Sequence, residues 1–139
     1  MGMKADLVTR LAGDAAISAI VNTALDTEEA ISWHGFQRGD NYPAIMLTMI
    51  TPGEEWTHDG VDPIERPRVR FDIRGADADV LETLSVAIKA EMRGAADVSD
   101  TRFHPAMLEA ERTINLDEQD GGELLFQVQL EFMFYHEEI

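Results

Sequence analysis

The chain has 139 residues, no cysteine and a formal net charge of −16, with 27 carboxylates against 11 lysines and arginines. This length predicts one domain over residues 1–139, and the charge argues against binding nucleic acid by neutralising its phosphates. The lack of cysteine excludes disulfides and cysteine-based metal sites. No apolar run approaches the roughly 20 residues that a membrane-spanning helix needs.

The first half of the chain predicts a helix and then a strand. Residues 4–22 carry apolar residues at helical spacing and predict a helix. This helix can break at Gly13, because Asp14 is a good N-cap for a second helical segment. Residues 41–51, "NYPAIMLTMIT", predict a central strand whose continuous apolar run indicates burial on both faces. Residues 51–67 are rich in glycine, proline and carboxylates, so they predict a long loop or a loosely paired hairpin extension.

The second half predicts a strand, a helix and a long hairpin. Residues 68–75, "RVRFDIRG", alternate between polar and apolar positions. Residues 76–94 predict a helix with Asp79 at its capped start. Residues 104–116 and 123–138 predict two antiparallel strands. The apolar face expected for the last strand consists of Phe126, Val128, Leu130, Phe132 and Phe134.

These elements predict an α+β fold class: a mostly antiparallel β-sheet with two helices packed on one face and a long C-terminal β-hairpin. The usual catalytic motifs are absent, including G-x-S-x-G, the P-loop, G-x-G-x-x-G and H-E-x-x-H. The four histidines lack metal-ligand spacing. The acidic turn 117–121 has glutamine and glycine where a calcium loop needs ligand oxygens. We therefore expect no catalytic site, no metal and no cofactor.

Charged side chains are expected to share the polar faces of neighbouring strands. Alternation puts Arg68, Arg70 and Arg74 on one face of their strand. It gives the final hairpin a polar face that contains Glu109, Glu111, Gln127, Gln129 and Glu131. Pairing Glu109 with Glu131 would be unfavourable, and a neighbouring arginine strand would relieve the repulsion. The alternatives are a charge-matched face within one subunit, arginine–carboxylate pairs across a subunit contact, and, third, contact of the arginines with DNA.

The loop over residues 51–67 is a second candidate interface with a neighbouring protein subunit. It carries Glu54, Glu55, Trp56 and Asp59. An aromatic side chain among carboxylates either anchors a contact with a partner or folds back onto its own domain.

The order of these segments resembles the tail-completion, or tail-terminator, family of long-tailed bacteriophages and gene transfer agents. The resemblance covers about residues 4–136, with one departure where "RGAD" replaces an aromatic residue that is frequent in the family. It rests on "LAGDAAISAIV", "SWHG", "NYPAIML", "RVRFDIRG" followed by "ADADVLETLSVAIKAEM", and "MLEAERTINLDEQDGGELLFQVQLEFMFY".

The resemblance implies a structural virion protein rather than an enzyme. Family members form a ring, usually a hexamer, that stops polymerisation of the tail tube and joins the tail to the head connector. The implied partners are further copies of the chain, the major tail tube protein and the head–tail connector or stopper protein, while DNA passes through the ring without specific binding. The implied location is the head–tail junction of the virion, after assembly in the bacterial host cytoplasm. The alternatives are a head-completion or neck protein of the same particle, and a small acidic ligand-binding module or enzyme.

Overall fold

The computed structural model confirms the α+β class. It describes residues 2–21, 31–33, 43–53, 56–57, 60–61, 64–75, 77–116 and 125–139. In chain order the elements are α1 (Met3–Gly13), α2 (Ala15–Val21), β1 (Ile31–Trp33), β2 (Ala44–Thr51), β3 (Trp56–Thr57), β4 (Gly60–Val61), β5 (Arg68–Gly75), α4 (Ala78–Met92), β6 (Ala96–Val98), β7 (Thr101–Phe103), β8 (Met107–Leu116), β9 (Leu125–Met133) and β10 (His136–Glu138).

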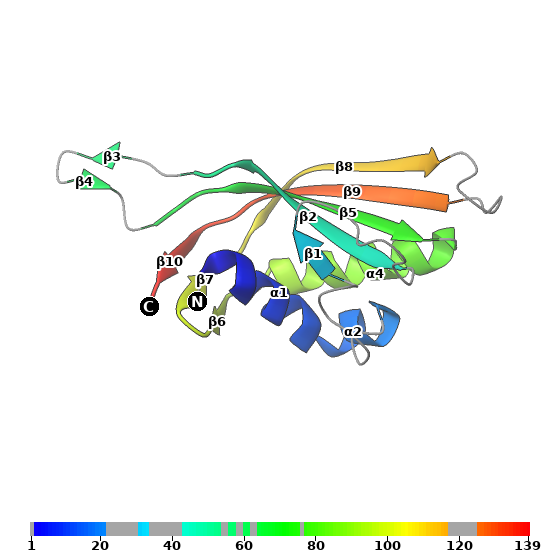
Figure 1. The fold of residues 1–139 in the computed structure, drawn as a ribbon, viewed down its shortest axis with the longest axis horizontal. Coiled ribbons are helices and arrows are strands. Elements are labelled where there is room, and N and C mark those ends of the chain that lie inside the picture. The colour runs from blue at the N-terminus through cyan, green and yellow to red at the C-terminus, as the bar shows by residue number, and fades with distance from the viewer. Residues whose placement is uncertain are drawn as a thin grey trace.

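The main sheet has the strand order β1-β2-β5-β9-β8, and its pairs are antiparallel except for β1 with β2. A second sheet, β10-β7-β6, lies at one end of the molecule, and β3 and β4 form a two-stranded arm that projects from the same end (Figure 1). Helices α1, α2 and α4 lie on one face of the main sheet. We call this the helix face, and the opposite face, which no described helix covers, the outer face.

The predicted N-terminal helix is interrupted at Asp14. The Asp14 carboxylate accepts hydrogen bonds from the backbone N–H groups of Ala16 (2.9 Å) and Ile17 (3.0 Å), so it caps α2. Leu7 and Leu11, one turn apart on α1, are fully buried. Within the described residues, none of the helices has both the length and the hydropathy needed to cross a membrane.

Helix α4 forms as predicted, but a different residue caps it. The Asp77 carboxylate accepts hydrogen bonds from the N–H groups of Asp79 (2.9 Å) and Val80 (3.5 Å). The cap predicted at Asp79 is therefore wrong, because Asp77 has the extended backbone of an N-cap and Asp79 already lies in the first turn. The buried stripe of the helix consists of Leu81, Leu84, Ser85, Ile88 and Met92.

The core lies between these helices and the helix face of the sheet. The register aligns Leu47, Phe71 and Leu130 across three strands, and all three are fully buried. The apolar face predicted for the last strand is confirmed, since Phe126 is half-buried and the rest is buried: Val128, Leu130, Phe132 and Phe134. Burial of both faces of β2 is wrong, because its outer-face residues Met46 and Thr48 are only half-buried.

The β3–β4 arm confirms a paired hairpin extension within residues 51–67, and its base is fixed by backbone contacts. The carbonyl of Gly53 accepts a hydrogen bond from the Arg66 N–H (2.9 Å), and Glu65 and His136 exchange two backbone hydrogen bonds (2.8 and 3.0 Å). Gly53 has a φ of +72°, and a Cβ atom there would collide with the main chain of Arg66. Glycine is therefore needed where the arm leaves the sheet.

Candidate interface

The outer face of the main sheet carries four of the charged residues that the sequence singles out: Arg68, Arg70, Arg74 and Glu131. The sequence left open whether the arginine strand is a neighbour of the final strand, and the structure shows that β5 pairs directly with β9. The register places Arg68, Arg70, Asp72 and Arg74 of β5 opposite Met133, Glu131, Gln129 and Gln127 of β9, respectively.

Four of these side chains form one hydrogen-bonded chain across the two strands. Arg70 Nε donates to Asp72 Oδ2 (3.0 Å), and Gln127 Nε2 donates to Asp72 Oδ1 (2.9 Å). Arg74 Nη2 donates in turn to Gln127 Oε1 (3.0 Å). Asp72 is fully buried and Gln127 nearly so, which strengthens these bonds by excluding water. The network therefore holds Arg70 and Arg74 in fixed orientations on the outer face.

The register of β8 differs from the simple alternation assumed from the sequence. An irregularity between Leu108 and Ala110 leaves Ala110, rather than Glu109, opposite Glu131. Glu111 then lies on the helix face, where its carboxylate accepts hydrogen bonds from Lys89 Nζ of α4 (3.0 and 3.1 Å). The predicted pairing of Glu109 with Glu131 and the predicted outer position of Glu111 are therefore wrong. The one-residue bulge in β8 moves each residue that follows it to the opposite face of the sheet. It also removes the unfavourable pairing of two carboxylates, Glu109 and Glu131.

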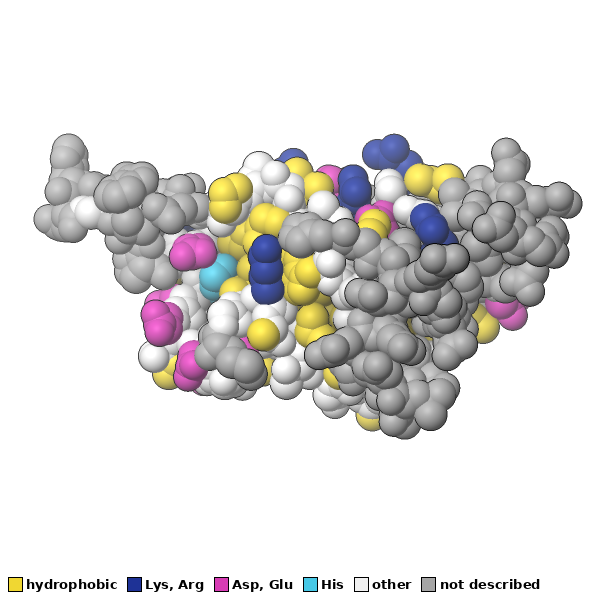
Figure 2. Space-filling view, viewed as in Figure 1, with side chains coloured by type: hydrophobic (Ala, Val, Ile, Leu, Met, Phe, Trp, Pro, Cys, Tyr) yellow, Lys and Arg dark blue, Asp and Glu magenta, His cyan; other side chains and the backbone are white. Residues whose placement is uncertain are grey.

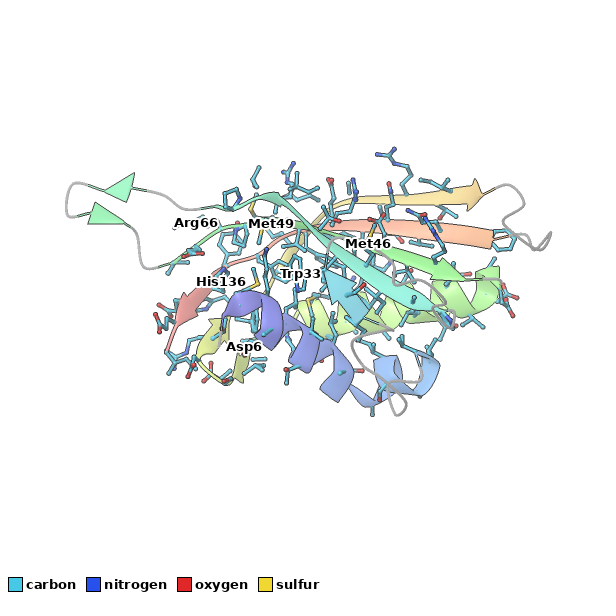
Figure 3. The ribbon with its side chains drawn as sticks, viewed as in Figure 1. Asp6, Trp33, Met46, Met49, Arg66 and His136 are labelled. Atoms are coloured by element: carbon cyan, nitrogen blue, oxygen red, sulfur yellow. The ribbon has the colours of Figure 1, made fainter. Side chains whose placement is uncertain are left out.

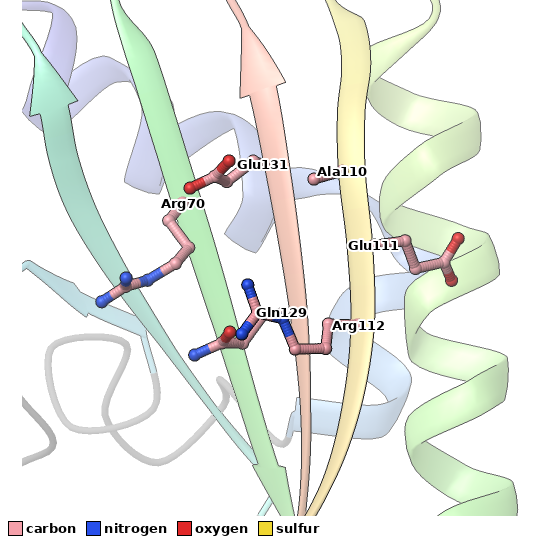
Figure 4. Close-up of a pocket in the computed structure, with 6 residues that line it drawn as sticks. All are labelled: Arg70, Ala110, Glu111, Arg112, Gln129 and Glu131. Carbon is pink, nitrogen blue, oxygen red and sulfur yellow. The ribbon is translucent and has the colours of Figure 1, made fainter.

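The same shift brings Arg112 to the outer face, opposite Gln129. Arg112 is exposed, and with Arg70, Gln129 and Glu131 it borders a hollow of about 250 Å³ at Ala110 (Figure 4). The small side chain of Ala110 leaves this space open. Sequence reasoning missed Arg112 because strict alternation puts it on the other face. The signal in the sequence that could have indicated a bulge was the unfavourable pairing of Glu109 with Glu131 that strict alternation implied.

The residues predicted on the arm are not placed on this surface. Glu54, Glu55 and Asp59 lie outside the described residues. Trp56 belongs to β3, but its side chain is outside the description. The contacts proposed for these four residues stay predictions.

A buried histidine lies at the base of the arm. His136 Nε2 is 3.5 Å from Glu65 Oε2, and its ring centre is 6.3 Å from that of Phe103 (Figure 3). Burial lowers the pKa of His136 below its ordinary value of 6.5, and the Glu65 carboxylate opposes this shift. Burial therefore favours the neutral form of His136 where β10 meets the arm.

Acidification is expected to destabilise the fold through His136. Because the folded pKa is lower than the unfolded one, the unfolded chain binds more protons as the pH falls below 6.5. The free energy of unfolding should therefore decrease as the pH falls from 6.5 through the folded pKa. Urea unfolding of wild type and His136→Gln at about pH 7.5 and about pH 5.5 measures this contribution. His104→Gln is the control; an equal pH dependence in wild type and His136→Gln would contradict the prediction.

Among the described residues, no group of three or more histidine, aspartate or glutamate side chains is placed to hold a metal ion. Figure 2 shows most of the visible Lys and Arg side chains along the upper edge of the view, where the outer face lies. This surface offers fixed cationic hydrogen-bond donors on a sheet, an arrangement that suits binding of carboxylates or other anions.

The fold defines the chain as an α+β protein with helices on one face of a mostly antiparallel sheet. No family model matches the sequence, and no curated protein matches it. Among solved structures, a chain from the "virion of native gene transfer agent (GTA) particle" is similar, with a TM-score of 0.62 and 12% sequence identity. The alignment covers 97% of this chain and 94% of that chain. At this identity the likeness shows the fold alone.

Proposed function

We propose that this chain is a structural virion protein that ends the tail tube of a phage-like particle as a ring and joins the tail to the head connector. The observation that carries the proposal is the end-to-end likeness to a gene transfer agent virion chain, over 97% of this chain. The order of sequence segments over about residues 4–136, which resembles that of tail-terminator proteins, supports the same role. The chain acts in this role by contact with other proteins and not as an enzyme.

The proposed ring is built from copies of this chain, six in the arrangement usual for the family that it resembles. A closed ring needs a heterologous contact, in which two different surfaces of each copy meet. The outer face and the β3–β4 arm are two such surfaces. The proposed further partners are the tail tube protein and the connector. The net charge of −16 keeps DNA from adhering as it passes through the ring.

Labelling of purified particles tests this placement. An antibody against the chain, detected with gold particles by electron microscopy, is expected to mark one point between head and tail. Label along the whole tail would contradict a role at the tube end. Absence of the chain from purified particles, shown by mass spectrometry, would overturn the proposal of a virion protein.

A further inference from the structure

The outer face is a basic surface on a strongly acidic protein. The charged residues that the register assigns to it are four arginines and two carboxylates: Arg68, Arg70, Arg74, Arg112, Asp72 and Glu131. The chain as a whole has 27 carboxylates and 11 basic residues. This face therefore has the opposite sign to the rest of the molecule, and it attracts anionic groups that the remaining surface repels.

The arginines differ in how far their charge is already matched. Arg70 and Arg74 belong to the network around Asp72. Arg68 and Arg112, by contrast, have no carboxylate partner among the described residues. Arg112 is also exposed, and it stands beside the hollow at Ala110. Of the two arginines that border the hollow, Arg70 is held in place by Asp72, and Arg112 is available to bind a carboxylate of another molecule.

The composition of the face favours a protein partner over nucleic acid. Its described positions include three methionines, Met46, Met107 and Met133, and its cations are all arginines. Arginine and methionine are enriched in protein–protein interfaces, whereas lysine is depleted there. Glu131 also borders the hollow, and it can pair with a cation of a protein partner, which the phosphate backbone of a nucleic acid does not supply.

We propose that the outer face binds the acidic surface of a second copy of this chain, with Arg112 and Arg70 receiving a carboxylate in the hollow at Ala110. This rests on the proposed ring and names the surface that closes it. A two-fold contact of the face with itself would oppose arginines with arginines, since Glu131 is the one carboxylate outside the buried network that the register of the described strands assigns to it. The contact is therefore head-to-tail, as ring closure requires.

Charge reversal at Arg112 tests this contact. Light scattering after size exclusion gives the mass of wild type, Arg112→Glu and the control Arg93→Glu, with circular dichroism to check folding. Arg93 is exposed at the end of α4 and lies off the outer face, so it receives the same change of charge elsewhere. We expect wild type and Arg93→Glu to assemble at low ionic strength and to dissociate at about 0.5 M salt. Arg112→Glu is expected to raise the dissociation constant at least about tenfold.

Three results would overturn the inference. If Arg112→Glu assembles as wild type does, a ring can still form but this face does not close it. If wild type stays monomeric at its highest soluble concentration, the second copy is not the occupant, and the tail-length measurement described below decides the proposed function separately. If wild type binds short duplex DNA in a salt-sensitive way that Arg112→Glu abolishes, phosphate is the ligand.

Discussion

Replacing Arg10 with alanine is expected to lower the free energy of unfolding by about 3 kcal/mol. Arg10 links α1 to the C-terminal end of α4: its Nε donates to Glu91 Oε1 (2.9 Å), and its Nη2 donates to the carbonyls of Glu91 (2.6 Å) and Gly94 (2.8 Å). Its side chain is 3% exposed and its guanidinium lies 5.3 Å from the centre of the Phe103 ring. Alanine removes all of these contacts. It also removes a cation from the C-terminal end of α4, where the partial negative charge of the helix dipole favours positive charge.

Arg102→Ala is the matched control for this prediction. Arg102 also pairs with a carboxylate, Asp97 (3.1 Å), but the two side chains are 47% and 57% exposed. The loss of such a pair is expected to cost less than about 0.5 kcal/mol. Urea unfolding followed by circular dichroism measures both variants. If Arg10→Ala costs no more than Arg102→Ala, Arg10 does not join the two helices energetically.

Phe71→Ala is expected to cost about 4 kcal/mol, because it leaves a cavity in the centre of the core. Phe71 is fully buried on the helix face of β5, and its ring centre lies 5.2 Å from that of Phe132 and 6.0 Å from that of Phe134. The edge-to-face contact with Phe132 adds to the loss of buried area. Neighbouring rings are held by β9 and the segment after it, so they cannot collapse fully into the space.

Val86→Ala provides the comparison for Phe71→Ala, since Val86 is 58% exposed on α4. We expect its effect to lie within about 0.5 kcal/mol of wild type. Thermal and urea unfolding of both variants measure the difference. A cost for Phe71→Ala below about 1.5 kcal/mol would contradict the close packing of the aromatic cluster.

The features that the sequence predicts correctly depend on local periodicity. The buried stripe on α4 follows from the period of about 3.6 residues in a helix, and the apolar face of β9 follows from the period of two residues in a strand. Both periods are visible in a sequence wherever one face of the element is buried. The outer positions of Arg68, Arg70 and Arg74 follow from the same alternation, and their neighbours are then set by the pairing of β5 with β9.

The features that the sequence does not predict depend on contacts between distant residues. Asp6 and Arg10 are charged residues of α1, and both are buried by partners far along the chain. Asp6 Oδ2 accepts a hydrogen bond from Thr101 Oγ1 (2.6 Å), and Arg10 bonds to the end of α4. In the candidate interface, Arg112 changes face because of one extra residue in β8, and a one-residue slip cannot be read from alternation itself.

The most direct measurement of the proposed function is the length distribution of tails made without this chain. The gene for the chain is deleted in cells that produce the particle, and tails are measured by electron microscopy beside cells complemented with wild type. We expect tails of variable and excessive length that lack heads, with normal length restored by complementation. Headless tails of the normal, uniform length would contradict a role in ending the tube and would favour a head-completion protein instead.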